Sequence, residues 1–179
     1  MSSHREANTF ALPRGLQNYA TPAAFKAALD AFYHFTRNLL TGEDYDPCPL
    51  NPEGIRTADG LGPTPEWVKS YFGNPPYGNV TPWLDKAIED RRRKVTACLL
   101  LRVDCSTAWM HDKVFPYARP IWVRGRLRFI RPGETKPQPS PFASVVAAYE
   151  PGISFPPQKV MWEDGEGWHL SEVATRMDT

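Results

Sequence analysis

One run of residues, 95–101, constrains the fold of this chain more than any other feature. It reads VTACLLL and carries no charge, whereas a strand with one solvated face alternates apolar and polar residues. A strand of this composition is buried on both faces and therefore lies inside a sheet that is covered on each side. Residues 81–93, which precede it, follow a Thr81-Pro82 helix start and supply a covering helix. The pattern predicts an α/β fold.

The remaining elements follow from the same periodicities. Apolar side chains at helical spacing follow Thr21-Pro22, and the segment 121–130 alternates apolar and polar residues. The complete prediction is helices at 22–39, 81–93 and 105–115, with strands at 43–49, 70–74, 95–101, 121–130 and 142–149. This order predicts a compact α/β sheet with flanking helices and a C-terminal antiparallel strand pair.

Length and composition favour one globular domain. The chain has 179 residues, of which 41% are hydrophobic and 23% charged. No apolar run approaches the ~18 residues that a membrane span needs. Three cysteines and a polar N-terminus favour a reducing compartment, so we expect a cytoplasmic protein that contacts no membrane. We expect a flexible arm at 1–20, a single domain at 21–150 and a peripheral acidic tail at 151–179.

Positive charge is concentrated in one part of the chain. Residues 91–136 hold 12 Lys and Arg against three acidic residues, a net charge of +9, whereas the segments before and after each carry −4. Such a segment in a nearly neutral protein indicates a polyanionic partner, usually nucleic acid. The alternation in 121–130 places Arg124, Arg126 and Arg128 on one face of a strand, as candidates for DNA contacts. Instead of binding DNA, these three arginines could keep an exposed edge strand soluble. The basic run 91–94 could likewise serve only to solvate the end of a helix.

The segment GNPPYG, residues 73–78, carries the most specific chemistry. It falls between a predicted strand and helix, where α/β sheets bind ligands. The lone pair of an exocyclic base amine is delocalised into the ring, and two hydrogen-bond acceptors return it to the nitrogen. Asn74 supplies one acceptor through its side-chain oxygen, and Pro75 supplies another through its carbonyl, held by Pro76. Tyr77 offers a face on which a base can stack. The alternative is a proline-rich turn.

This chemistry requires no metal ion and no nucleophilic side chain. Cys98, Cys105 and His111 lie near one another in the sequence, but their spacing is not that of a metal site. Catalysis would come from positioning the amine in line with an activated methyl group, and from acceptors that gain strength as the nitrogen becomes positive. We therefore predict no metal site.

Motifs along most of the chain, in addition to residues 73–78, occur in the order typical of one known family. From about Thr21 to Glu150 the chain resembles the phage-type DNA N6-adenine methyltransferases. The residues that match, as they stand here, are Thr21-Pro22 with Phe25 and Leu29, Asp46-Pro47, Asp59-Gly60-Leu61 with Trp67, Asn74-Pro75-Pro76-Tyr77-Gly78, Trp83, LLLRVDCSTAWMHD at 99–112, Arg124-Gly125-Arg126-Leu127-Arg128-Phe129 and Ser140-Pro141-Phe142. The resemblance implies S-adenosylmethionine as methyl donor, double-stranded DNA as substrate and a reduced Rossmann-like core.

The resemblance also implies roles for single residues. Residues 74–77 become the catalytic loop, into which the target adenine is flipped. Asp46, with Pro47, matches the acidic position near the methionine end of the donor. Asp59 is a candidate for the donor's adenine or ribose, and Thr21-Pro22 would border its carboxylate.

The donor-binding part departs from the pattern of larger enzymes. The stretch that follows Asp46 has no glycine before Gly54, and only 28 positions separate Asp46 from Asn74. These departures leave two interpretations. Either the donor pocket is reduced and built from loops, or the protein is weakly active or needs a partner protein. A non-catalytic DNA-binding relative is therefore one alternative function. Methylation of cytosine N4 is another, and glutamine methylation in proteins is a more distant one, which the +9 segment disfavours. The sequence indicates neither the recognition site nor the oligomeric state.

Overall fold

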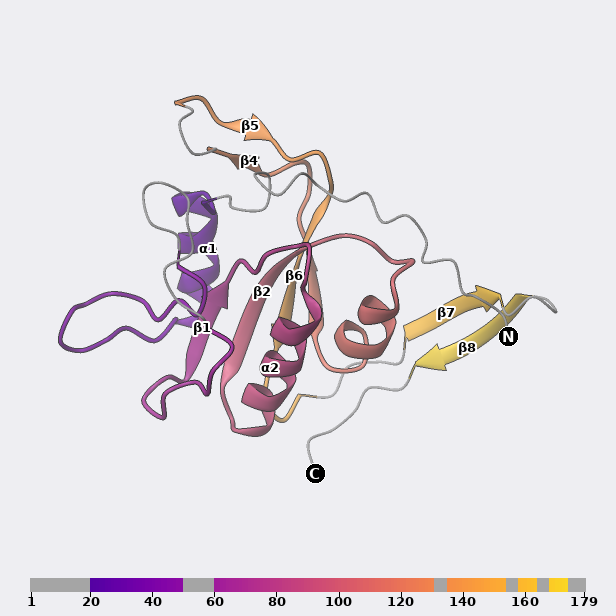
Figure 1. Ribbon diagram of the computed structural model, residues 1–179, viewed down its shortest axis with the longest axis horizontal. Helices are drawn as coiled ribbons and strands as arrows, with labels where there is room; N and C mark the ends of the chain where they lie inside the picture. The colour runs from indigo at the N-terminus through magenta and orange to yellow at the C-terminus, as the bar shows by residue number, and fades with distance from the viewer. Residues whose placement is uncertain (1–19, 50–59, 131–134, 154–157, 164–167, 174–179) are drawn as a thin grey trace.

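The core of the protein is a four-stranded mixed sheet (Figure 1). The computed structural model describes residues 20–49, 60–130, 135–153, 158–163 and 168–173. The sheet has the order β1-β2-β6-β3, and its strands are β1 (Ser70–Gly73), β2 (Thr96–Arg102), β6 (Ser144–Tyr149) and β3 (Arg119–Trp122). β1 and β2 are parallel, and β6 is antiparallel to both β2 and β3. The predicted α/β class and the antiparallel pair are confirmed.

Helix α2 (Thr81–Arg92) covers one face of this sheet and connects β1 to β2. Its predicted inner stripe of Leu84, Ala87 and Ile88 is buried, and it packs in one cluster with Leu99 and Leu101 of β2. Because side chains alternate along a strand, the other residues of β2 point to the opposite face. The run that suggested a doubly buried strand is therefore a central strand of the sheet.

Helix α1 (Ala23–Tyr33) lies on the opposite face, where Phe25 and Leu29 pack against a cluster containing Phe72 and Leu100. The predicted helix 22–39 is too long. In the structure, α1 is capped at its C-terminal end by His34, which has a left-handed φ of 51°. The Asp30 side chain then accepts a hydrogen bond from the Phe35 backbone N–H at 2.7 Å, in place of a helical carbonyl. Phe35 turns into the core as a result.

The predicted strand 43–49 is also wrong. The structure has a single antiparallel bridge there, between Arg37 and Asp44. Pro47 and Pro49 lack the N–H groups that a ladder needs. The Asp46 carboxylate accepts a hydrogen bond from the Cys48 N–H at 2.8 Å, which closes a local turn instead of a strand.

The predicted strand 121–130 is broken in the middle. β3 ends at Trp122, Gly125 has a φ of +82°, and pairing resumes only in β4 (Arg128–Phe129). A residue with positive φ departs from the extended backbone of a regular strand, and the pairing ends before this one. β4 pairs with β5 (Gln138–Pro139), which lies between the predicted strands 121–130 and 142–149, and the two form a projecting hairpin (Figure 1). The predicted alternation of buried and exposed side chains is still present, because Leu127 and Phe129 are buried whereas Arg124, Arg126 and Arg128 are exposed.

The remaining elements are short. In place of the predicted helix 105–115, regular structure is confined to a π-helical turn, η2 (Met110–Val114), and the two residues before it. The acidic tail contains an antiparallel hairpin of β7 (Gln158–Glu163) and β8 (Trp168–Val173), separate from the main sheet. The predicted arm 1–20 lies outside the described residues except for Ala20. Over the described ranges, no helix has the length and apolar character that a bilayer span requires.

Candidate functional site

The segment 74–80 links the carboxyl end of β1 to the start of α2, and we refer to it as the NPPY loop. β1 stops at Gly73 because Pro75 and Pro76 cannot donate to a strand ladder. A hydrogen bond from the Asn79 N–H to the Pro76 carbonyl, at 3.2 Å, then turns the chain into the helix. Pro75 and Tyr77 are buried, whereas Asn74 is partly exposed. The Asn74 side chain is thus presented at the end of the sheet, at a strand-to-helix junction as expected.

Two contacts of Tyr77 order this loop. Its hydroxyl donates a hydrogen bond to the Asn74 Oδ1 at 3.1 Å. Its ring meets the edge of Phe142, with the ring centroids 5.1 Å apart and the planes at 89°. The first contact orients the amide of Asn74, and the second fixes the ring that holds it. Since Phe142 lies between β5 and β6, the NPPY loop is also tied to the base of the β4–β5 hairpin.

Segments proposed for donor binding meet this loop at Pro47. A Cβ on Gly73 would lie 3.4 Å from the Pro47 Cγ, so Pro47 lies directly beside the residue that precedes Asn74. A Cβ on Gly60 would lie 1.5 Å from the Pro47 carbonyl oxygen, so only a glycine allows this close approach. The structure therefore brings together Asp46-Pro47, the turn at Gly60 and the NPPY loop. Asp59 itself lies outside the described residues.

The other predicted site residues lie near the strands of the β4–β5 hairpin in the sequence or in the fold. Thr21 and Pro22 precede α1, next to Ala20, which forms a β-bridge with Ile130 at the end of β4. Arg124 and Arg126 are exposed on the segment between β3 and β4. Arg128, also exposed, donates a hydrogen bond to the Pro137 carbonyl across the hairpin at 3.4 Å. The Ser140 N–H bonds to the Leu127 carbonyl at 2.7 Å, close to the Phe142 that contacts Tyr77.

A comparison with protein families identifies the class of protein. The sequence profile described as DNA N-6-adenine-methyltransferase (Dam) matches residues 14–151. The chain belongs to this family. The match covers the main sheet, the NPPY loop and the β4–β5 hairpin of this Dam-family protein, and it confirms the predicted resemblance. No significant match was found among curated proteins or solved structures.

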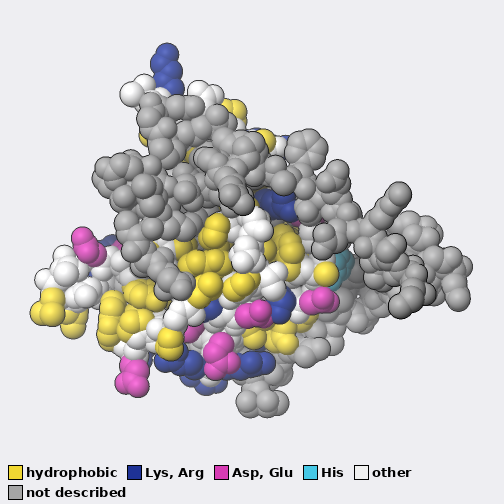
Figure 2. Space-filling view, in the orientation of Figure 1, with side chains coloured by type: hydrophobic (Ala, Val, Ile, Leu, Met, Phe, Trp, Pro, Cys, Tyr) yellow, Lys and Arg dark blue, Asp and Glu magenta, His cyan; other side chains and the backbone are white. Residues whose placement is uncertain are grey.

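In this Dam-family chain, Arg91, the first residue of the basic run 91–94, has a structural role in the interior. Arg91 is 1% exposed, and its guanidinium donates to the backbone carbonyls of Glu150 at 3.0 Å and Ile153 at 2.9 Å. Arg92, Arg93 and Lys94 are exposed at the C-terminal end of α2, where Figure 2 shows Lys and Arg side chains grouped. This arrangement fits the alternative that the run solvates a helix end, where cations oppose the helix dipole.

A buried polar network fixes the loop around Gly60 to α2. Asp90 accepts hydrogen bonds from Thr64 at 2.7 Å and Tyr71 at 2.8 Å, and it pairs with Lys86 at 3.2 Å. Lys86 also donates to Thr64 and, at 2.8 Å, to the Gly62 carbonyl. Burial, with the Asp90 carboxylate nearby, raises the pKa of Tyr71 well above its usual value, so that phenol remains a donor. The network holds residues 62–64 in place.

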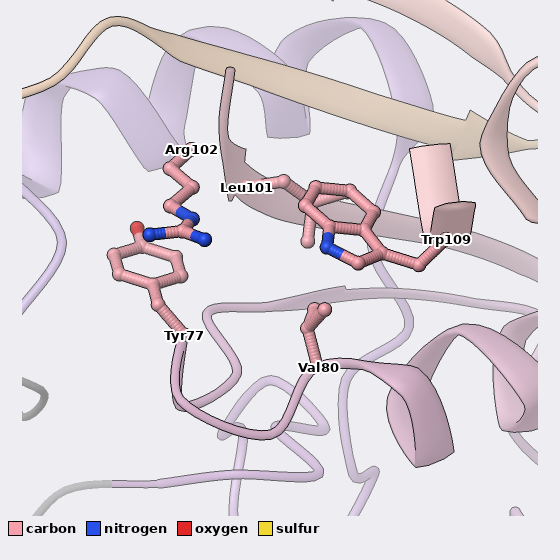
Figure 3. A pocket seen from close by; sticks show the side chains of 5 residues that line it. All are labelled: Tyr77, Val80, Leu101, Arg102 and Trp109. Atoms are coloured by element: carbon pink, nitrogen blue, oxygen red, sulfur yellow. The ribbon is translucent and has the colours of Figure 1, made fainter. Parts of the chain in front are cut away.

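Two residues beside the NPPY loop were not predicted as site residues. Arg102 ends β2 and Trp109 precedes η2, and both line a pocket with Tyr77 (Figure 3). Arg102 could have been suspected, because it is the first charge after the apolar run. Within the described ranges, no three His, Cys, Asp or Glu side chains are placed to share a metal ion.

Proposed function

We propose that this protein transfers the methyl group of S-adenosylmethionine to the N6 amine of adenine in double-stranded DNA. One observation carries the proposal: the Asn74 amide, oriented by the Tyr77 hydroxyl, lies at the carboxyl end of β1, where Pro47 lies beside the preceding Gly73. The family's description names the same base and the same nitrogen. We also interpret the β1–α2–β2 unit with its antiparallel β6 as a reduced Rossmann-like core.

The catalytic contribution of the NPPY loop is to accept hydrogen bonds from the amine. A side-chain amide oxygen has two lone pairs, and Tyr77 uses one of them at Asn74. In this proposal the Asn74 Oδ1 accepts one N–H of the base amine, and the Pro75 carbonyl accepts the second N–H. Both acceptors become more effective as the nitrogen gains positive charge, so they stabilise the transition state more than the ground state.

The donor supplies an activated methyl group, and this chain's residues hold it beside the amine. Asp46 and Asp59 provide carboxylates, which suit a molecule with a sulfonium and an ammonium group, and Thr21-Pro22 would border the donor's own carboxylate. The fit rests on Pro47, which lies in contact distance of Gly73 and whose carbonyl oxygen approaches Gly60 so closely that a side chain at Gly60 would displace one of the two segments. The donor pocket is therefore built from loops that converge on the NPPY loop.

DNA is held by three exposed arginines on β4 and on the segment that precedes it. Arg124, Arg126 and Arg128 are exposed and would contact phosphates, with an affinity that falls as salt rises. The target adenine must leave the base stack to reach Asn74, because its N6 is otherwise paired inside the duplex. Tyr77 supplies a ring on which the extruded base can stack.

The test is a transfer assay with identification of the product. Purified protein is incubated with methyl-labelled S-adenosylmethionine and unmethylated duplex DNA, which is then digested to nucleosides. Label in N6-methyladenine supports the proposal, and label in N4-methylcytosine replaces it with cytosine methylation. Retained DNA binding without any transfer would indicate a non-catalytic relative.

A further inference from the structure

Trp122, the last residue of β3, leaves a large aromatic side chain open to solvent. Trp122 is 56% exposed, although its neighbour Ile121 packs against the cluster on the α1 face of the sheet. Trp122 is paired with Val145 of β6, and Val145 is paired with Leu101 of β2. Directly paired residues share a face, and Val145 and Leu101 pack in the cluster that contains α2. The indole therefore lies on the α2 face of the sheet.

β3 ends at the same edge of the sheet as β1 and β2. β1 and β2 are parallel, and β3 has their direction because β2 and β3 are both antiparallel to β6. Trp122 is level with Leu101 of β2, two residues past the partner of Gly73. The NPPY loop begins at Asn74, directly after Gly73, so Trp122 and this loop lie at one edge. Sheets of this class bind their ligands at the carboxyl ends of parallel strands.

Trp122 also adjoins the exposed arginines of the basic segment. Arg124, Arg126 and Arg128 follow it within six residues and are exposed. Three strand spacings separate β1 from β3 in the sheet order, so Trp122 lies about 14 Å across the edge from the end of β1. A duplex covers this distance in about four base pairs. A duplex that has its target at Asn74 and its phosphates on the arginines therefore passes over Trp122.

We infer that Trp122 is a DNA-contacting residue, whose indole packs against a nucleotide about four base pairs from the target adenine. The inference rests on the proposed function, and it extends the DNA interface from the arginines to the carboxyl end of β3. Such packing requires no particular sequence, because every base has a flat face on which an aromatic ring can stack. The contact is apolar and neutralises no phosphate, which distinguishes it from the contacts of the arginines.

DNA binding tests the contact without the methyl donor. The variants are Trp122→Ala and Trp122→Phe, and fluorescence anisotropy with a labelled duplex measures their affinity over a range of salt concentrations. Trp67→Ala is the matched control, since Trp67 is 45% exposed and precedes the amino end of β1, toward the opposite end of the sheet. Thermal unfolding is measured for each variant.

We expect Trp122→Ala to bind DNA about 5- to 150-fold more weakly, as for the loss of one stacking partner. Trp122→Phe keeps a ring and should retain most of the affinity, and Trp67→Ala should bind like the wild type. The salt dependence of Trp122→Ala should equal that of the wild type, because the indole displaces no counterions. A variant that only disturbed the neighbouring arginines would instead show a reduced salt dependence.

A second measurement reports the contact itself. The emission of a tryptophan changes when a base packs against its indole. The chain has six tryptophans, so the contribution of one is obtained as a difference between proteins. The change in emission on adding DNA should be smaller in Trp122→Phe than in the wild type, and Trp67→Phe should keep the contribution of Trp122.

The outcomes separate this inference from the proposed function. Wild-type DNA affinity in Trp122→Ala would overturn the inference and leave the reaction intact. A reduced salt dependence in Trp122→Ala, an equal loss of affinity in Trp67→Ala, or an unchanged emission signal in Trp122→Phe would also overturn it. If the wild type transfers no methyl group, the proposed function fails, but none of these measurements uses S-adenosylmethionine. A selective loss of affinity in Trp122→Ala would then still support the DNA contact.

Discussion

The Tyr77 hydroxyl donates a hydrogen bond to the Asn74 Oδ1 over 3.1 Å, within a single loop. The same ring is held edge-on by Phe142, which comes from a distant part of the chain. The orientation of the Asn74 amide is therefore coupled to the packing between the NPPY loop and the base of the hairpin. An acceptor that is already oriented needs no rearrangement when the substrate arrives.

Tyr77→Phe removes this hydrogen bond and keeps the ring. We expect kcat to fall about 2- to 10-fold, because a neutral hydrogen bond contributes about 0.5–1.5 kcal/mol. The KM for DNA should change little, since the stacking face remains. Steady-state kinetics on duplex DNA measure both constants. A raised KM with an unchanged kcat would show that the hydroxyl binds DNA and does not orient Asn74.

Gly60→Ala should weaken binding of S-adenosylmethionine. The added Cβ would lie 1.5 Å from the Pro47 carbonyl oxygen, so one of the two segments must move. Titration calorimetry with the donor alone measures the effect, and we expect at least about a tenfold loss, equivalent to ~1.4 kcal/mol.

Gly62→Ala is the matched control for that variant. It lies two residues away, and its Cβ would meet no atom within 4 Å. If both variants bind the donor like the wild type, Pro47 and Gly60 do not border the donor pocket.

Lys86→Met should destabilise the fold. It leaves the Asp90 carboxylate, with 2% of its side chain exposed, without its closest cation. Loss of one partner of a buried ion pair costs about 3–5 kcal/mol, and we expect the lower end because Thr64 and Tyr71 still donate to Asp90. Urea unfolding measures the free energy. Arg92→Met, which breaks the exposed pair with Glu89, should cost under about 1 kcal/mol, and equal losses in the two variants would contradict the network's role.

Arg126→Ala should weaken DNA binding at low salt and reduce its salt dependence. Each phosphate contact contributes about 0.9 to the slope of log K against log salt, so the slope should fall by about that amount. Fluorescence anisotropy over a range of salt concentrations measures it. An unchanged slope would remove Arg126 from the DNA interface, and Arg92→Ala provides the exposed control.

The sequence correctly predicted the helices and strands that are determined by their own residues and immediate neighbours. The apolar run became β2, and Thr81-Pro82 marked the start of α2. The NPPY loop lies between strand and helix because Pro75 and Pro76 end β1, and Pro82, just after the loop, suits the first turn of α2.

The failures have distant or single-residue causes. The pattern in 121–130 predicted which side chains are buried, but it did not reveal that Gly125 adopts a φ of +82° and breaks the strand. The helix 22–39 was too long because the Asp30 side chain ends it by binding the Phe35 N–H. The meeting of Pro47, Gly60 and Gly73 depends on tertiary packing, which no periodicity reports.

Asn74→Ala under single-turnover conditions tests the central claim most directly. The variant removes the side-chain acceptor from a partly exposed position, so thermal unfolding should stay close to that of the wild type. The account predicts that the rate of label incorporation into N6-methyladenine falls by at least about 100-fold, as when one transition-state hydrogen-bonding group is removed. A folded Asn74→Ala protein that methylates DNA at the wild-type rate would contradict it.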